Sequence, residues 1–188
     1  MPRPVSAALV CAALLAATPA GASQVVHLDT RGLTHESSDI VIGKVGDQHA
    51  HWNAAHTMIV TDVTIAVDQA LKGGASGALT LTQVGGEVDG MRYSVDGSPS
   101  FKPGEEVLVF AWRDAQGRPQ VDGLAQGKFE IRRDPATGMR TVQRSLPGLG
   151  VADARTLRAP GVMSPAAARV PLDDLVREIR AAMTEAGR

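Results

Sequence analysis

Cysteine and aromatic residues are scarce in this sequence. Its 188 residues include one cysteine, Cys11, and six aromatic side chains (two Trp, one Tyr and three Phe). Cys11 lies in an N-terminal segment that we expect to be removed, so the mature chain is predicted to be free of cysteine. That excludes disulfides, thiolate metal ligands and cysteine nucleophiles. With so few aromatic residues, the core must consist mainly of Val, Leu, Ile and Ala.

The sequence also lacks an excess of either charge and lacks a long apolar run. Nineteen Lys and Arg face 20 Asp and Glu, for a formal net charge of −1. Proteins that bind duplex nucleic acid need many cations to displace phosphate counterions, so we expect no nucleic-acid partner. The longest apolar run, residues 7–17, is about half of the roughly 20 residues that a membrane-spanning helix requires. We therefore expect no transmembrane segment in the mature chain.

Residues 1–22 have the pattern of a secretory signal peptide. Arg3 supplies the positive start, residues 7–17 form the apolar stretch, and Ala20-Gly21-Ala22 matches the small-residue cleavage pattern. We predict cleavage after Ala22 and export of the chain, either to the periplasm or to the medium.

The body of the chain is predicted to be mainly β. Short segments rich in β-branched and alternating apolar residues are separated by Gly- and Pro-rich turns, a pattern typical of antiparallel strands. The predicted strands lie at residues 40–45, 57–71, 79–82, 91–95, 107–112, 129–132 and 139–142. Strands at this spacing favour a closed or nearly closed antiparallel barrel.

The C-terminal part is predicted to contain a helix. Residues 145–170 are rich in Pro, Gly and Ala and are expected to form an irregular linker that wraps the barrel. Over residues 171–188, apolar side chains recur at helical spacing, and the opposite face carries both signs of charge. This pattern predicts an amphipathic helix packed on the barrel. The apolar stripe consists of Leu172, Leu175, Val176, Ile179 and Met183.

Several motifs in a fixed order carry a resemblance to a known family. They are Ser-Asp-Ile-Val-Ile-Gly-Lys-Val at 38–45, a strand from Thr61 that ends in Leu-Lys-Gly at 71–73, Phe-Lys-Pro-Gly-Glu at 101–105 and Val-Leu-Val-Phe at 107–110. Over about residues 33–133, this order resembles a family of secreted bacterial proteins of unknown function. That family is in turn similar to the OB-like barrel of netrin modules and tissue inhibitors of metalloproteinases. The resemblance implies that residues 23–144 form an OB-like barrel. It does not extend to the zinc-chelating N-terminal cysteine of those inhibitors, because the predicted mature N-terminus is Ser23.

Three histidines form a candidate metal site. His49 and His51 point to the same side if residues 48–52 are extended, and a hairpin tip at residues 52–55 would place His51 opposite His56. Neutral imidazole nitrogens are ligands for Zn²⁺ and Cu²⁺. The alternative is a solvated hairpin tip that is rich in polar residues, because a slip of one residue in register turns alternate side chains away.

Other clusters carry weaker predictions. The segment Gly-Gly-Glu-Val-Asp-Gly at 85–90 lacks the context of a phosphate-binding loop, so its glycines are interpreted as turn residues. Glu87, Asp89 and Asp96 could supply oxygen ligands for Ca²⁺, without EF-hand spacing. Four arginines around the last predicted hairpin form either a solvated face or a surface for anionic polysaccharide or lipid headgroups. They are Arg132, Arg133, Arg140 and Arg144.

No catalytic motif is recognisable. The sequence has neither a Gly-x-Ser-x-Gly elbow nor a His-Glu-x-x-His helix. We predict an exported, non-catalytic binding module without a cofactor, whose partner is a protein or another component of the cell envelope. Loops at residues 49–56 and 85–100 are the expected contacts. One alternative is a periplasmic Zn²⁺- or Cu²⁺-binding protein, and a second is a hydrolase whose catalytic residues assemble in space.

Overall fold

The computed structural model describes residues 24–146, 150–152 and 169–186. Most of its strands belong to one antiparallel sheet in the order β12-β10-β9-β7-β2-β3-β4, with β8 paired to β7. The strands are β2 (Asp39–Trp52), β3 (Ile59–Lys72), β4 (Ala78–Val84), β7 (Glu106–Arg113), β8 (Pro119–Val121), β9 (Lys128–Arg133), β10 (Arg140–Arg144) and β12 (Val170–Pro171).

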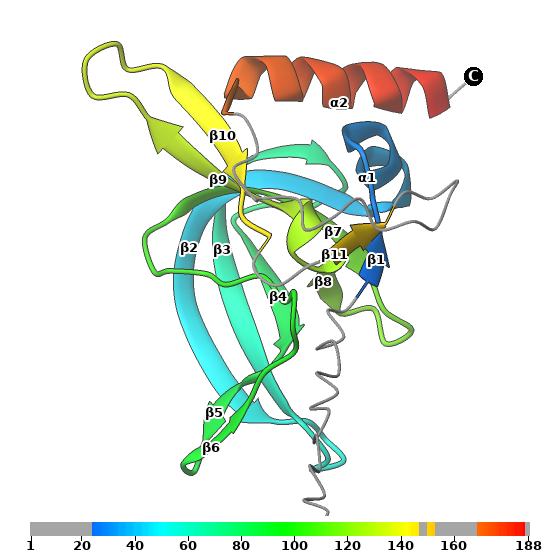
Figure 1. The fold of residues 1–188 in the computed structure, drawn as a ribbon, viewed down its shortest axis with the longest axis vertical. Coiled ribbons are helices and arrows are strands. Elements are labelled where there is room, and N and C mark those ends of the chain that lie inside the picture. Colours follow the sequence, from blue (N-terminus) through cyan, green and yellow to red (C-terminus); the bar gives the residue numbers. More distant parts are fainter. Residues whose placement is uncertain (1–23, 147–149, 153–168, 187–188) are drawn as a thin grey trace, which may run out of the picture.

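The remaining elements lie around this sheet (Figure 1). Strands β5 (Gly86–Val88) and β6 (Met91–Tyr93) form a small hairpin at the lower end of the long strands, and β1 (Gln24–Val26) pairs in parallel with β11 (Gly150–Ala152). Helix α2 (Leu172–Ala186) lies across the top, against α1 (Thr30–Glu36), and a short 3-10 helix, η1 (Leu124–Gly127), precedes β9. Neither α1 nor α2 is long and apolar enough to span a membrane.

Strand β2 joins the two halves of the sheet. Its first residues pair with β7 on one side, while the whole strand pairs with β3 on the other side through a ladder with several register shifts. One shift lies next to Gly43, where β3 passes so closely that a Cβ atom would lie 2.2 Å from the carbonyl oxygen of Ala66. This close approach lets β2 and β3 curve together (Figure 1).

The structure confirms a mainly β fold with an antiparallel sheet and a C-terminal helix, but it does not show a closed barrel. Strands β4 and β12 end the sheet. Although β4 approaches β8, no ladder joins them within the described part of the chain. A barrel closes only when strand number, tilt and stagger agree, and the three-residue β8 is too short to supply a long ladder.

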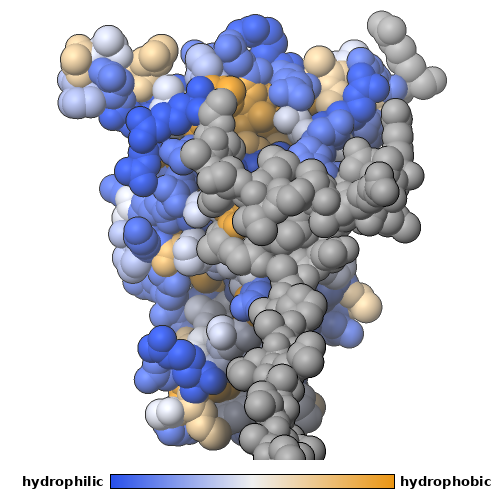
Figure 2. All heavy atoms as spheres, viewed as in Figure 1, coloured by the Kyte–Doolittle hydropathy of each residue, from blue (hydrophilic) through white to orange (hydrophobic). Residues whose placement is uncertain are grey.

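The core lies on both faces of the sheet. One cluster is enclosed by the curved strands, and the other lies between the sheet and the helices. The inner cluster includes Val41, Val63, Ile65, Leu81, Val107 and Val109. The helix-side cluster includes Leu33, Ile42, Phe110, Phe129, Leu175 and Ile179. In Figure 2, hydrophilic residues cover most of the visible described surface, and hydrophobic residues gather beneath α2 and at the lower end.

Helix α2 confirms the predicted amphipathic pattern. Leu172, Leu175 and Ile179 are buried against the sheet, and Asp173 and Asp174 occupy the first turn, where negative charge favours the helix dipole. The predicted signal peptide lies outside the described residues. Most of the predicted linker does too, but its described residues 150–152 form a short strand.

Candidate functional site

A groove lies between the inner face of strands β2–β4 and the segment that leads from β6 to β7. We call it the inner groove. It has a volume of about 320 Å³. It is lined by Gln48, Thr61, Val63, Gln83, Val84, Gly85, Gly86, Tyr93, Ser94, Val95, Ser98, Pro99, Ser100 and Phe101.

One wall of the inner groove is the sheet itself. The ladders place Gln48 opposite Val63 and Thr61 opposite Gln83, so these side chains share one face. The same face carries the apolar core further along the strands, where Val63 pairs with Leu81. The inner groove therefore begins where the core-facing side of the sheet changes from apolar to amide and hydroxyl side chains.

A double glycine folds the β5–β6 hairpin over this wall. Gly85 and Gly86 have positive φ values of 115° and 137°. Residues other than glycine strongly disfavour this backbone region. A Cβ atom on Gly86 would lie 2.5 Å from the hydroxyl oxygen of Thr61, and that hydroxyl donates to the carbonyl of Gly85 at 2.7 Å. Of the glycines that the sequence interpreted as turn residues, only Gly90 lies in a turn, while Gly85 connects β4 to β5 and Gly86 begins β5. The two glycines bring the hairpin into contact with β2 and β3.

The other wall is held by a buried lysine. Lys128 is 6% exposed, and its Nζ donates to the carbonyl of Ser100 at 2.5 Å and to both carboxylate oxygens of Glu105 at 2.9 Å. The same ammonium lies 4.9 Å from the centre of the Phe101 ring. The Gln48 amide donates to the Phe101 carbonyl at 3.2 Å. Sequence reasoning missed Lys128, because a lysine at the start of a strand gives no signal of burial.

The lining of the inner groove is uncharged. Its polar groups are amides and hydroxyls, and its aromatic groups are Phe101 and Tyr93, the latter 44% exposed. The Nε2 of Gln83 is shielded from solvent and has no hydrogen-bond partner in the described part of the chain. A buried donor without a partner destabilises the fold by about 1–3 kcal/mol.

Two of the three predicted histidines, His49 and His51, lie on the opposite, outer face of β2. The His49 and His51 rings stack with their centres 5.7 Å apart, as expected for side chains on one side of a strand. His51 uses both ring nitrogens: Nδ1 lies 2.9 Å from the Trp52 carbonyl, and Nε2 lies 3.1 Å from Asp62 Oδ2. The Trp52 carbonyl, with help from the Asp62 carboxylate, raises the pKa of His51 against the opposing effect of burial.

His56 does not join this pair. The β2–β3 register places His51 opposite Val60, not His56, so the predicted pairing across a tip at residues 52–55 is wrong. The connection is longer because the Asn53 side chain accepts hydrogen bonds from the backbone N–H groups of Thr57 and Met58. His56 has a φ of 52°, and its ring stacks with the Trp52 ring at 6.2 Å.

The geometry of the histidines limits what they do together. The described residues contain no group of three or more His, Cys, Asp or Glu side chains arranged to hold a metal ion. The Zn²⁺ or Cu²⁺ site stays a prediction from the sequence, with His49 and His51 side by side and His56 apart. The Thr82 hydroxyl donates to Asp62 at 2.8 Å. It therefore does not donate to His51, as a nucleophile activated by a His–Asp pair would.

The other predicted clusters are dispersed. Glu87 of the calcium candidate forms an ion pair with Arg92 at 2.8 Å, and Asp89 lies in the β5–β6 turn with a φ of 52°. Asp96 follows β6, in the segment that leads to β7. Of the four arginines, Arg132 pairs with Glu130 at 3.0 Å, and Arg144 lies over the Phe129 ring. The remaining two, Arg133 and Arg140, are cross-strand neighbours on β9 and β10.

The groove and the His49–His51 pair thus occupy opposite faces of the sheet. Eight of the groove's lining residues come from residues 85–100, which are among the expected contacts. Comparison with protein-family models, curated proteins and solved structures found no match for this chain.

Proposed function

We propose that this protein is an exported, non-catalytic binding module with an OB-like architecture, and that its inner groove holds an uncharged, hydroxyl-rich ligand of the saccharide class. Export rests on the signal-like N-terminal segment. The OB-like architecture rests on the family resemblance and on the strongly curved antiparallel sheet. The ligand class rests on the chemistry of the groove.

The observation that carries the proposal is an uncharged lining that combines amides, hydroxyls and aromatic rings. Amide and hydroxyl groups donate and accept at once, and they therefore match the alternating donors and acceptors of neighbouring hydroxyl groups. An aromatic ring offers an apolar face to the C–H groups of a sugar, with a polar hydroxyl at the edge in the case of tyrosine. A few placed polar groups in a mainly apolar pocket are the common arrangement of small-molecule sites.

The lining also explains which ligands are disfavoured. None of the residues that line the groove is Lys or Arg, so the groove offers no counterion to a phosphate backbone or an acidic sugar. A charged ligand would lose its hydration without gaining an ionic partner. Neutral oligosaccharides should therefore bind better than acidic ones of equal length.

The experiment is a titration of the mature protein with neutral and acidic oligosaccharides, followed by two-dimensional NMR. We expect a neutral oligosaccharide to shift the amide signals of Gln83, Tyr93 and Ser100. Tyr93→Ala and Gln83→Leu should each raise the Kd about tenfold, while the control Thr80→Ala, on the outer face of β4, leaves it unchanged. Preference for acidic ligands, or equal effects of all three variants, would contradict the proposal.

A further inference from the structure

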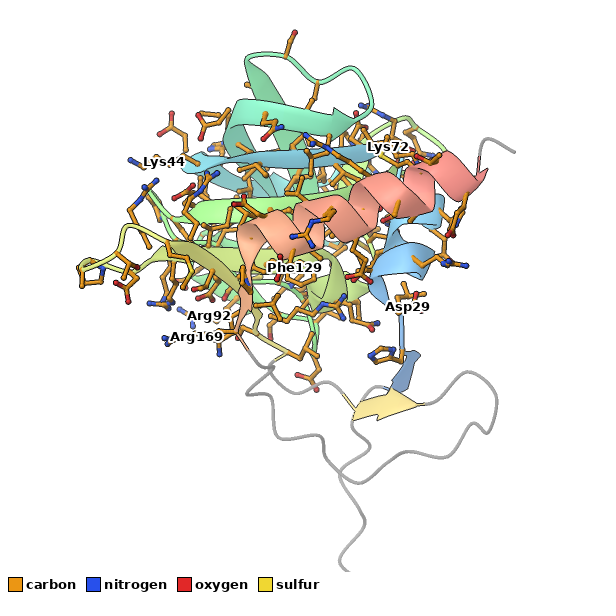
Figure 3. The ribbon with its side chains drawn as sticks, turned by 90° about the horizontal axis from the view of Figure 1, so that it is seen from above. Asp29, Lys44, Lys72, Arg92, Phe129 and Arg169 are labelled. Carbon is orange, nitrogen blue, oxygen red and sulfur yellow. The ribbon has the colours of Figure 1, made fainter. Side chains whose placement is uncertain are left out.

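A second concave site lies at the other end of the molecule, between α2 and the sheet. It has a volume of about 290 Å³, and we call it the α2 cleft. Arg140 of β10 and Arg177 and Arg180 of α2 line it together with Gln69 and Asp173. Seen from above in Figure 3, α2 lies across the strands. Arg140 is about 40 residues away in the chain from the two arginines of α2, and the fold brings all three to the lining of one cleft.

The acidic residues around the α2 cleft only partly balance these cations. Arg140 Nη1 lies 3.2 Å from Glu106 Oε1, and Arg177 forms an ion pair with Asp174. In the described part of the chain, Arg180 has no acidic partner within 4.0 Å.

The basic surface extends beyond the cleft itself. Arg133, directly across the ladder from Arg140, is exposed and likewise lacks an acidic partner among the described residues. On the other side, Lys44 of β2 lies opposite Glu106 of β7. Counted with Arg133 and Lys44, which lie on the same side of the sheet, five cations outnumber the three carboxylates of Glu106, Asp173 and Asp174.

We propose that the α2 cleft binds a phosphate or sulfate group. Guanidinium groups present pairs of N–H donors in a planar fork, which matches the oxygens of these anions. Like charges that converge on one cleft repel each other, and a bound oxyanion relieves that repulsion. The floor of the cleft is apolar, with Ile42, Leu172 and Val176, and a low local dielectric strengthens the attraction between the guanidinium groups and the anion.

This proposal is independent of the one for the inner groove. The α2 cleft is lined by α2, by Arg140 of β10 and by Ile42 and Gln69 at one end of β2 and β3, whereas the groove lies at the other end of these two strands (Figure 1). A failure to bind saccharides in the inner groove would not affect the proposal for the α2 cleft. A failure to bind anions in the α2 cleft would likewise not affect the proposal for the groove. The cleft includes Arg140, one of the four arginines that the sequence analysis named. It also includes Arg177 and Arg180 of α2, which the sequence did not connect with those four.

The test measures binding of inorganic phosphate and sulfate to the mature protein by NMR at low ionic strength. Wild type should bind both ions, with shifts at Gln69, Arg140 and Arg180. Arg180→Gln and Arg140→Gln should each raise the Kd about tenfold or more, and Arg180→Lys, which keeps the charge but loses the fork, should have a smaller effect. The control is Arg132→Gln, because Arg132 points to the opposite face of β9 and pairs with Glu130. No binding, or equal loss in the control, would overturn the proposal.

A second arm identifies the source of the anion. Vesicles of phosphatidylglycerol and vesicles of phosphatidylcholine are compared for binding, with inorganic phosphate as competitor. Binding to phosphatidylglycerol vesicles that phosphate displaces and Arg180→Gln weakens supports a lipid headgroup in the cleft. Binding of the free ions alone supports a soluble phosphate or sulfate ester. Vesicle binding that neither phosphate nor the variants affect would overturn recognition of a lipid headgroup in the α2 cleft.

Discussion

Gly43 permits a close approach of β2 and β3. A Cβ atom there would lie 2.2 Å from the Ala66 carbonyl oxygen and 2.9 Å from Cγ2 of Ile65, so backbone would have to move. At Gly46, three residues along the same strand, the nearest atom is the Thr64 carbonyl oxygen at 3.4 Å, which is an ordinary contact.

We expect Gly43→Ala to lower the free energy of unfolding by about 1–3 kcal/mol, the usual effect of overpacking. The matched control, Gly46→Ala, should change it little or raise it slightly, because alanine has less conformational freedom to lose in a strand than glycine. Urea denaturation of both variants measures the difference. Equal stability of the two variants would show that the strands do not need the close approach.

His51 makes the stability of the sheet dependent on pH. Both of its ring nitrogens face acceptors, the Trp52 carbonyl and the Asp62 carboxylate, so the charged imidazolium satisfies both contacts. Its pKa in the folded protein is raised above the ordinary value. The resulting stabilisation is fully present below the unfolded pKa of about 6.5 and is lost as the pH rises through the higher folded pKa.

We therefore expect His51→Gln to lower the Tm at pH 5.5 more than at pH 8.5. The side chain is 39% exposed, so solvent screens the interaction and the effect should be modest. Thermal unfolding at the two pH values tests this expectation, with His56→Gln, a change at the exposed hairpin turn, as the control. A Tm decrease that is the same at both pH values would contradict it.

The histidines also show the limit of sequence reasoning at the scale of single residues. Alternation correctly predicted that His49 and His51 share a face. The partner across the hairpin was wrong because the turn is set by hydrogen bonds of Asn53 with Thr57 and Met58, and these have no periodic signature. The connection spans residues 53–58 instead of 52–55, and this difference in length changes which side chain faces His51.

Among the elements, β9 supplies the residue that holds one wall of the inner groove in place, although no β9 residue lines the groove. Lys128, its first residue, links β9 to Glu105 and to the backbone of Ser100, next to the groove residue Phe101. The side chains of this ion pair are 7% and 14% exposed. Loss of one member of a buried pair leaves the other charge without a partner, which is more destabilising than loss of both.

We expect Lys128→Met to lower the free energy of unfolding by about 3–5 kcal/mol and the double variant Lys128→Met/Glu105→Gln to recover part of the loss. Arg118→Gln, which removes a guanidinium that is 48% exposed from its pair with Asp114, should have an effect of about 1 kcal/mol or less. Chemical denaturation of the three variants provides the comparison. If Lys128→Met is as mild as Arg118→Gln, Lys128 does not hold the wall.

Elements with a clear period were predictable, and short elements were not. The stripe of α2 and the alternation in β3 follow from burial of one face, and both are confirmed. The β1–β11 pair was missed because it joins two three-residue segments far apart in the chain, in parallel. Nothing local in either segment indicates its partner. The β5–β6 hairpin was predicted only in part, through the glycines at 85 and 86 and the strand near Met91.

For the whole molecule, the two proposed sites separate by charge. The inner groove at one end is uncharged, and the α2 cleft at the other end has an excess of arginine. The net charge of −1 gives no indication of this separation. Such a division arises from strand register and helix placement, which bring distant residues together, and so composition alone could not predict it. The strand pattern predicted a closed or nearly closed barrel, and the structure does not show a closed one. Closure depends on the relative stagger of the strands, which the sequence pattern does not indicate.

The connectivity of β2 has a consequence for the order of folding. Strands β2, β3 and β4 are consecutive in the chain and pair through short loops, whereas β7 must return from far along the chain to pair with β2. Long loops are slower to close than short ones, so the β2–β4 meander should form before β7 docks. The inner groove has one wall on that meander and the other on the segment that Lys128 ties down. The groove is therefore completed late in folding. A chain that binds a ligand in the groove has already assembled both halves of the sheet.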